Sequence, residues 1–396
     1  MKIPVWLPLL LGLLTAVGSV STDMYLPAFP AIETALGGRP GAAQITLAAF
    51  FAGLALGQIS MGALSDRFGR RVPLILGTAL YTLATIGCAL APDITTLSLC
   101  RFVSALGGSA GMVIPRAIVR DLADGHAATR LISRQVLVMG AAPILAPTLG
   151  GVVLTFAGWQ AVFWVCALYG AICCLAVALL MPETLLAERR VYDSLARLTR
   201  RYGTIAVEPS FLANALACSG SSFALFAYIG GSPMVFERTY HLSPSAYGAM
   251  FSTCAMGFIL FSQINPSAVH RWGVGPMLRV GTRALLAAHL LMLGLALAQP
   301  ATWWLLALPI FLASGCGALV MANATVGSLH RHAAHAGSAT ALMGTMQFVL
   351  GASSGLAVGL LGDGTARPMA ALMLCGGLLA AGADLWRGRV ERRDPA

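Results

Sequence analysis

Two ionisable residues, Asp23 and Arg101, lie within long apolar runs of this sequence. A charge at the centre of a membrane helix costs about 2.5 to 3.5 kcal/mol, so such residues usually face a wet cavity or a partner. A carboxylate there can bind and release a proton, and its protonation would respond to hydration and to its distance from an arginine. We therefore expect Asp23 and Arg101 to act together in binding and releasing a proton. Two structural alternatives stay open, in which Asp23 caps a helix broken before Pro27 and Arg101 bonds backbone carbonyls.

The apolar runs that would hold these residues recur along the whole chain. Of its 396 residues, 58% are hydrophobic and 10% are charged, whereas soluble domains are about 45 to 50% apolar. A run of about 20 apolar residues can cross a bilayer as a helix. We expect an all-α integral membrane protein with twelve transmembrane helices, at residues 5–26, 42–64, 73–91, 95–117, 132–155, 158–181, 210–232, 245–267, 276–298, 301–324, 336–360 and 367–386.

The basic residues indicate the orientation. Lys and Arg of short loops stay on the cytoplasmic side, and with both termini inside, all but four of the 25 basic residues fall in cytoplasmic segments. We expect a multi-pass membrane protein with both termini in the cytoplasm. A signal peptide after Lys2 is the alternative, but its apolar run is long and its removal would invert the loop charges. No soluble domain gathers the positive charge, so we expect no nucleic-acid partner.

The longest polar interruption separates six expected spans from six. We divide the chain into an N-terminal six-helix bundle at 1–181, a cytoplasmic linker at 182–209, and a C-terminal bundle with a short basic tail at 210–396. Within the linker, apolar residues recur at helical spacing, which favours an amphipathic surface helix over a solvated loop; they are Leu185, Leu186, Val191, Leu195 and Leu198. The halves also echo each other, because the Arg-x-Gly of Arg67 and Gly69 returns as Arg271 and Gly273. Duplicated halves are typical of transporters.

One loop carries a family signature. The run Gly62-Ala-Leu-Ser-Asp66-Arg67-Phe-Gly69-Arg70-Arg71 resembles the signature between the second and third helices of the major facilitator superfamily. The resemblance implies two six-helix pseudo-repeat bundles that alternate access to a central site. It also implies that this loop controls the conformational change and does not bind substrate. A glycine there permits a tight turn, and the arginines hold the loop inside.

Three further stretches resemble the Bcr/CflA branch of drug/proton antiporters. They are Ser21-Thr22-Asp23-Met24-Tyr25-Leu26-Pro27, Arg101 with Arg116-Ala-Ile-Val-Arg120-Asp121, and Ala146-Pro147-Thr148-Leu149-Gly150-Gly151. In the last of these, Pro147, Gly150 and Gly151 permit bending and close helix approach, so we add them to the gating residues. The sequence departs from the family pattern at Ala146, Ser104 and Thr15, and the last of these leaves the first helix with a single acid. A single acid favours export of neutral or weakly charged compounds.

Polar and aromatic residues inside the expected spans are candidates for the substrate cavity. They would either line a solute route or bond neighbouring helices, for about 0.6 kcal/mol each; they are Tyr25, Asn214, Ser219, Ser222, Tyr228, Gln263, Asn323 and Gln347. His289 is a further candidate proton carrier. The cluster of His330, His332 and His335 lacks a fourth ligand, so we expect no metal site and no cofactor.

The resemblance implies proton-coupled export of small amphipathic compounds, such as phenicols, bicyclomycin or metabolites. The partners would be a small-molecule substrate, protons and the lipid bilayer, and we expect a monomer. A proton-coupled importer is the closest alternative. A polytopic sensor or enzyme is less favoured, because no group of catalytic residues gathers at one membrane face.

Overall fold

The computed structural model describes residues 4, 6–39, 41–122, 125–190 and 195–393, and every regular element in these ranges is helical. The elements are α1 (Leu7–Asp23), η1 (Leu26–Ala28), α2 (Phe29–Ala35), α3 (Ala42–Phe68), α4 (Arg71–Ala89), α5 (Ile94–Leu122), α6 (Gly125–Leu180), η2 (Ala187–Arg189), α7 (Leu195–Ala206), α8 (Pro209–Pro233), η3 (Met234–Thr239), α9 (Pro244–Trp272), α10 (Val274–Ala298), α11 (Trp304–Leu329), η4 (His330–His335), α12 (Ala336–Leu361) and α13 (Arg367–Arg393).

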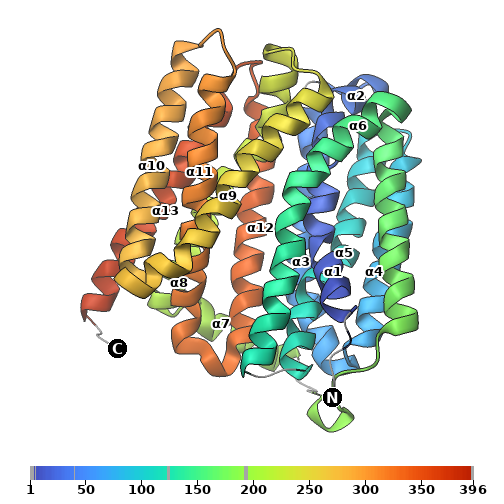
Figure 1. Cartoon of the computed structure of the whole chain (residues 1–396), viewed down its shortest axis with the longest axis vertical. Helices are drawn as coiled ribbons and strands as arrows, with labels where there is room; N and C mark the ends of the chain where they lie inside the picture. Colours follow the sequence, from blue (N-terminus) through green and yellow to red (C-terminus); the bar gives the residue numbers. More distant parts are fainter. Residues whose placement is uncertain (1–3, 5, 40, 123–124, 191–194, 394–396) are drawn as a thin grey trace.

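Eleven continuous segments of these ranges are long and apolar enough to span a membrane, and one of them must cross it twice. The segment Ala141–Leu180 has 40 residues, which at a rise of 1.5 Å per residue is about twice the thickness of a hydrocarbon core. Gly158 interrupts it with φ 76° and ψ 177°, a conformation outside the helical region. The chain reverses there (Figure 1). The expectation of twelve spans is therefore confirmed.

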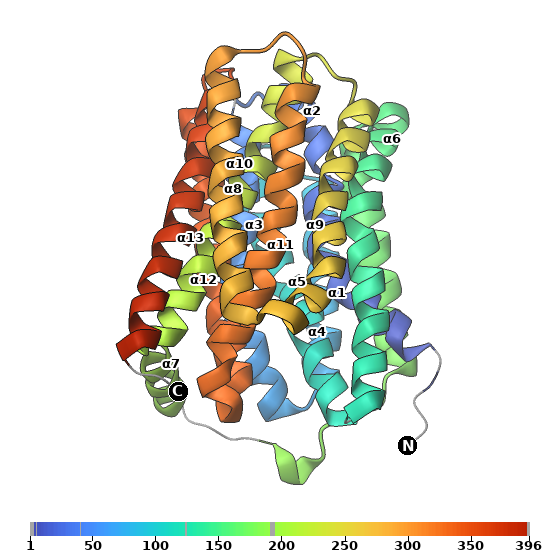
Figure 2. The same cartoon turned by 60° about the vertical axis from the view of Figure 1, so that its left-hand side comes forward.

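The helices pack as two groups that meet along two helix pairs. Helices α1 and α3 to α6 pack against one another, as do α8 to α13. Between the groups, α3 packs on α12 and α6 packs on α9. Helix α1 begins and α13 ends at the same end of the molecule, which we call the termini end (Figures 1 and 2). The other end, which holds α2 and η3, is called the opposite end.

Matching positions in the two halves adopt the same conformation. Gly69 ends α3 with φ 90° and ψ 171°, and Gly273 ends α9 with φ 86° and ψ 164°. Both glycines hold the left-handed φ that side chains disfavour. Gly53 of α3 lies against the Phe102 carbonyl of α5, and Gly257 of α9 lies against the Phe311 carbonyl of α11. The weak sequence echo therefore corresponds to a structural repeat.

Two expected elements differ in detail. The first span breaks at its end, because Pro27 and Pro30 remove backbone donors and the helix continues only as η1 and α2. The linker forms a helix over Leu195–Ala206, which is shorter than the stretch from Leu185 that the leucine spacing indicated. Of the residues in that pattern, Val191 lies outside the described residues. The division at 182 and 209 stays a prediction.

Candidate functional site

Asp23 occupies the last turn of α1, immediately before the break. Its side chain is 6% exposed, and it forms no hydrogen bond or ion pair with any other described residue. It lies close enough to Tyr228 of α8 and Tyr247 of α9 to interact electrostatically with both. The carboxyl group of the first half therefore faces two tyrosines of the second half.

Arg101 of α5 points into the N-terminal bundle. Its guanidinium carbon lies 4.0 Å from the centroid of the Phe50 ring, 4.5 Å from that of Tyr25 and 5.9 Å from that of Phe163. Nη1 donates to the Ser21 carbonyl oxygen at 2.9 Å, while Nε and Nη2 are buried with no hydrogen-bond partner among the described residues. Cation–π contacts of this kind stabilise a desolvated guanidinium by about 2 kcal/mol.

The expected pair is thus connected through the backbone of α1. Arg101 bonds the carbonyl of Ser21, two residues before Asp23, as the alternative structural interpretation had it. The Ser21 hydroxyl is in turn hydrogen bonded to Tyr81 of α4 at 2.7 Å. A change at Arg101 would therefore reach Asp23 through the position of the end of α1. A role in proton coupling stays a prediction for both Asp23 and Arg101.

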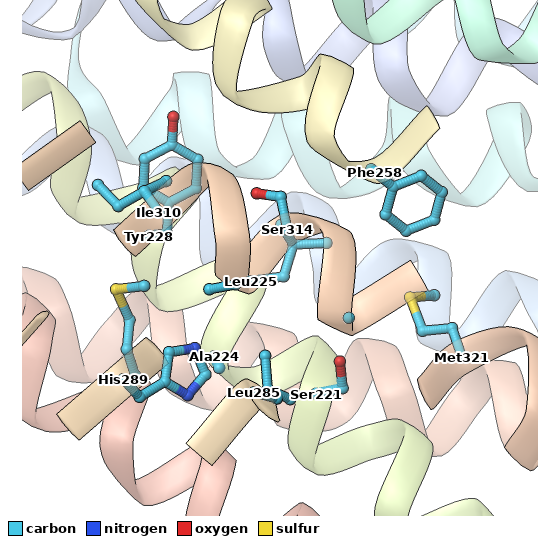
Figure 3. Close-up of a pocket in the computed structure, with 13 residues that line it drawn as sticks. Ser221, Ala224, Leu225, Tyr228, Phe258, Leu285, His289, Ile310, Ser314 and Met321 are labelled. Carbon is cyan, nitrogen blue, oxygen red and sulfur yellow. The ribbon is translucent and has the colours of Figure 1, made fainter. Parts of the chain in front are cut away.

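A cavity opens inside the C-terminal bundle, and Tyr228 lines it (Figure 3). His289 of α10 and Ser314 of α11 line the same cavity, among apolar side chains such as Phe258. The Tyr228 ring stacks on Phe251 at 5.2 Å with an interplanar angle of 12°. Both the Tyr228 hydroxyl and the His289 Nδ1 are buried with no hydrogen-bond partner in the described part of the chain. The accessible volume of the cavity is about 20 Å³, and its lining combines polar atoms with aromatic rings, as sites for amphipathic solutes do.

The other cavity candidates lie elsewhere, and several are bonded within the bundles. Tyr25 is buried in the N-terminal bundle, where its hydroxyl bonds Thr46 and the Ala43 carbonyl. Of the remaining polar candidates, some form hydrogen bonds to a neighbouring helix, one bonds within its own helix, and the others are buried or exposed without such a bond to any residue that the structure describes. Ser222 donates to Gln347 at 3.2 Å, Asn323 donates to Asn265 at 2.8 Å, Asn214 donates to the Ser210 carbonyl, Ser219 is buried, and Gln263 is exposed. Their contribution to substrate binding stays a prediction.

The signature loop forms a bonded network at the termini end. Arg70 is 6% exposed and bridges two helices, with Nη1 2.5 Å from Asp66 and Nε 2.8 Å from Asp121 of α5. Glu183, which follows α6, accepts the backbone N–H groups of Arg70 at 2.8 Å and of Arg71 at 3.2 Å.

Glu183 also explains the glycine of the signature. A Cβ on Gly69 would overlap its carboxylate. Desolvation opposes ionisation of Glu183, but the N–H groups that it accepts outweigh this effect and hold the pKa of its carboxyl below the usual value. Among the other signature residues, Arg67 stacks on the Phe68 ring and Gly62 faces Val113 with room for a side chain.

The three candidate gating residues of α6 lie where helices approach most closely. Gly151 lies against the Pro244 carbonyl at the start of α9, and Gly248 of α9 lies against the Pro147 carbonyl. Gly150 lies against the Met24 carbonyl, next to Asp23. The Thr148 and Ser252 hydroxyls bond between α6 and α9 at 2.9 Å. The Gly151 and Gly248 contacts require glycine and join the halves near the opposite end, whereas the Gly150 contact lies within the first half.

A second contact between the halves lies at the opposite end and was not expected from the sequence. Arg238 of η3 donates to Glu33 of α2 at 2.6 Å. The backbone of Gly41 also packs against the backbone of Gly359, where α3 and α12 meet. A sequence signal was present, because Glu33 and Arg238 are charged residues at the ends of apolar runs. Of the histidine cluster, His332 lies 3.5 Å from Glu208, and the side chain of His335 lies outside the described residues.

The comparisons with known proteins agree with this architecture. Residues 11–383 match the family model of the Major Facilitator Superfamily. The chain belongs to the major facilitator superfamily. It is therefore a multi-pass membrane transporter of small molecules rather than an enzyme, and it has relatives in bacteria.

Two curated relatives of this major facilitator protein span nearly its whole length. It is 33% identical over 375 residues to the MFS-type transporter YdgK of Bacillus subtilis, covering 93% of this chain and 91% of that protein. It is 29% identical over 361 residues to a bicyclomycin resistance protein homologue of Haemophilus influenzae, covering 91% and 90%. A bacterial homologue of the human lysosomal transporter Spinster, solved in an inward-facing conformation, matches with a TM-score of 0.72 at 17% identity over 99% and 98% of the two chains. That structure shows the shared fold.

Proposed function

We propose that this transporter is a proton-coupled antiporter that exports small amphipathic compounds, and that Asp23 is its proton-binding site. The observation that carries the proposal is the buried, unpaired carboxyl group of Asp23, which interacts with Tyr228 and Tyr247 of the other half. A buried carboxylate without a partner is costly in the charged form and tolerable in the neutral form. Movement between the halves can hydrate Asp23 or bring it closer to Tyr228 and Tyr247. Either change would alter the proton occupancy of the Asp23 carboxyl group.

The cavity at Tyr228 supports the substrate half of the proposal. Tyr228 lines the cavity and also lies in electrostatic reach of Asp23, so a solute that contacts this tyrosine alters the surroundings of the carboxyl group. Binding of proton and solute can then exclude each other, which is the requirement for exchange. A membrane potential supplies about 2.3 kcal/mol for each charge moved per 100 mV. Bicyclomycin-like and phenicol-like compounds are the substrates that the family resemblance favours.

The orientation follows the basic residues. The loops of Arg67, Arg70 and Arg71 and the end of α13 lie at the termini end, which we assign to the cytoplasm. The opposite end then faces outward from the bacterial inner membrane. Close backbone contacts hold the halves together there, which supports loading of substrate from the cytoplasm. We further propose that the single chain, which carries both halves, acts as a monomer.

Transport by Asp23→Asn tests the proton site. We would reconstitute the protein in vesicles, impose a pH gradient, and measure movement of radiolabelled bicyclomycin and chloramphenicol. Asp23→Asn should lose gradient-driven movement, because an amide binds no proton in this range. The control is Asp93→Asn, in which an exposed carboxylate that caps α5 through Thr96 is removed. The control should transport like the wild type.

The same vesicles distinguish the direction of exchange. Solute movement opposite to the proton gradient supports export, and accumulation with the protons would establish the importer instead. Gradient-driven transport by Asp23→Asn at the wild-type rate would show that the proton binds elsewhere. If the wild-type protein moves neither compound, the assignment of drug substrates is wrong.

A further inference from the structure

A second buried carboxyl group lies at the opposite end, in the segment that follows α8. Glu237 belongs to η3, a π-helix over Met234–Thr239. π-helical segments are rare and occur frequently at functional sites. Both carboxyl oxygens of Glu237 are buried, and neither has a hydrogen-bond partner among the described residues. An ionised carboxylate held in this way is costly, so the arrangement suits a protonated group.

The neighbouring residue makes the opposite kind of contact. Arg238 donates Nη2 to Glu33 Oε2 at 2.6 Å, which joins η3 to α2 of the other half. Glu33 is 3% exposed, and its Oε1 accepts the backbone N–H groups of Gly41 at 2.9 Å and Ala43 at 3.1 Å. The same guanidinium also lies in electrostatic reach of Glu237. Two carboxyl groups therefore share one arginine, and in this structure Glu33 holds it.

Beside η3, the loop before α13 carries Asp363, which interacts with Arg367 at the start of α13, and Thr239 of η3 donates to the Gly364 carbonyl of this loop. Helix α8 ends in residues 229–233, which carry no ionisable side chain, and α2 supplies Glu33. From α9, Tyr247 interacts electrostatically with Glu237 and with Asp23, and its hydroxyl is hydrogen bonded to Ser232 at 2.7 Å. Tyr247 is fully buried. It is thus a common neighbour of the two unpaired carboxyl groups.

We propose that Glu237 is a second proton-binding site of this transporter. Protonation of Glu237 removes its charge, so that Arg238 pairs with Glu33 alone, and this ion pair between η3 and α2 closes the opposite end. Once Glu237 loses its proton, its negative charge competes for Arg238 and weakens the contact between η3 and α2. A proton taken up at the outward-facing end would then favour closure there, which is the order of events that an antiporter needs. The proposal rests on the proposed function for the direction of proton movement. The competition for Arg238 rests on the buried, unpartnered oxygens of Glu237 and on the ion pair between Arg238 and Glu33.

Closure of the opposite end can be measured without any substrate. Spin labels would be placed at Ala35→Cys on α2 and Ala301→Cys in the loop before α11, both exposed positions, in a cysteine-free background. Double electron–electron resonance would give the distribution of distances between the two spin labels from mildly acidic to mildly alkaline pH. The wild-type distribution should be short in acid and lengthen as the pH rises. Glu237→Gln, which mimics the protonated acid, should stay short throughout.

A wild-type pH response in Glu237→Gln, or no response in the wild type, would overturn the proposal. If Glu237→Gln does not fold, Glu237→Asp and Arg238→Gln take its place, because the first keeps a titrating group and should respond, whereas the second removes the shared cation and should not. Asp23→Asn in the same labelled background separates the two proton sites. Loss of transport in that variant with a retained distance response would support both proposals, and retained transport would remove only the assignment of Asp23.

Discussion

Gly248 lies at the backbone contact between α6 and α9, so adding one methyl group there should disturb closure of the opposite end. A Cβ at this position would lie 2.5 Å from the Pro147 carbonyl oxygen and 3.1 Å from the Thr148 Cα. Both are backbone atoms that cannot rotate away. Overpacking of this kind costs about 1 to 3 kcal/mol. If the contact exists only in the closed state, Gly248→Ala should reduce the closed-to-open ratio about 5- to 150-fold.

Cross-linking between the halves measures that ratio. Thr148 and Ser252 bond across α6 and α9 at 2.9 Å, and cysteines at both positions should form a disulfide when the opposite end is closed. The rate of oxidation should fall about 5- to 150-fold in Gly248→Ala. Gly294→Ala is the matched control, because a Cβ in that helical position meets no atom within 4 Å. Equal cross-linking rates in the two variants would show that the α6–α9 contact does not limit closure.

Two further predictions concern the network at the termini end. The pKa of Glu183 is lowered in the folded protein, so its contribution to stability is present above the unfolded carboxyl pKa and is lost as the pH falls through the folded value. The difference in Tm between the wild type and Glu183→Gln should therefore be largest at neutral pH and shrink in acid. A difference independent of pH would contradict the hydrogen-bonding account. Removal of Arg70 leaves Asp121 without its cation, and the Asp121 side chain is only 17% exposed. Arg70→Met should therefore destabilise the folded protein by about 3 kcal/mol. The Tm in detergent measures this effect, and an unchanged Tm would contradict the expectation.

The number and order of the spans were predictable because each depends on local composition. A run of about 20 apolar residues must form a helix in lipid whatever its neighbours are. The same local information explains the turn at Gly69, where a glycine and basic residues act within one short loop. The break after Asp23 was visible in Pro27 and Pro30, and separate spans at 132–155 and 158–181 were expected although no polar loop marks the reversal at Gly158.

The contacts of the site were harder to predict because they depend on helix rotation. Glu183 accepts N–H groups of Arg70 and Arg71, which lie more than a hundred residues earlier, and no local pattern connects them. Arg101 was expected to act with Asp23, and the structure shows it bonded to the Ser21 carbonyl, two residues before Asp23. Among the polar cavity candidates, only packing decides which of them, such as Tyr228, faces open space. Glu237 gave no signal beyond its position near a helix end.

The repeat also preserves an interaction while reversing its chemistry. Glu183 follows the sixth span and accepts N–H groups from the turn after Gly69, whereas Arg387 of α13 donates to the Gly275 carbonyl in the first turn of α10, after Gly273, at 3.3 Å. One loop is therefore held by a negative side chain through its donors, and the other by a positive side chain through its acceptors. Acid that protonates Glu183 would therefore release the turn of the first half and leave the contact of the second half in place.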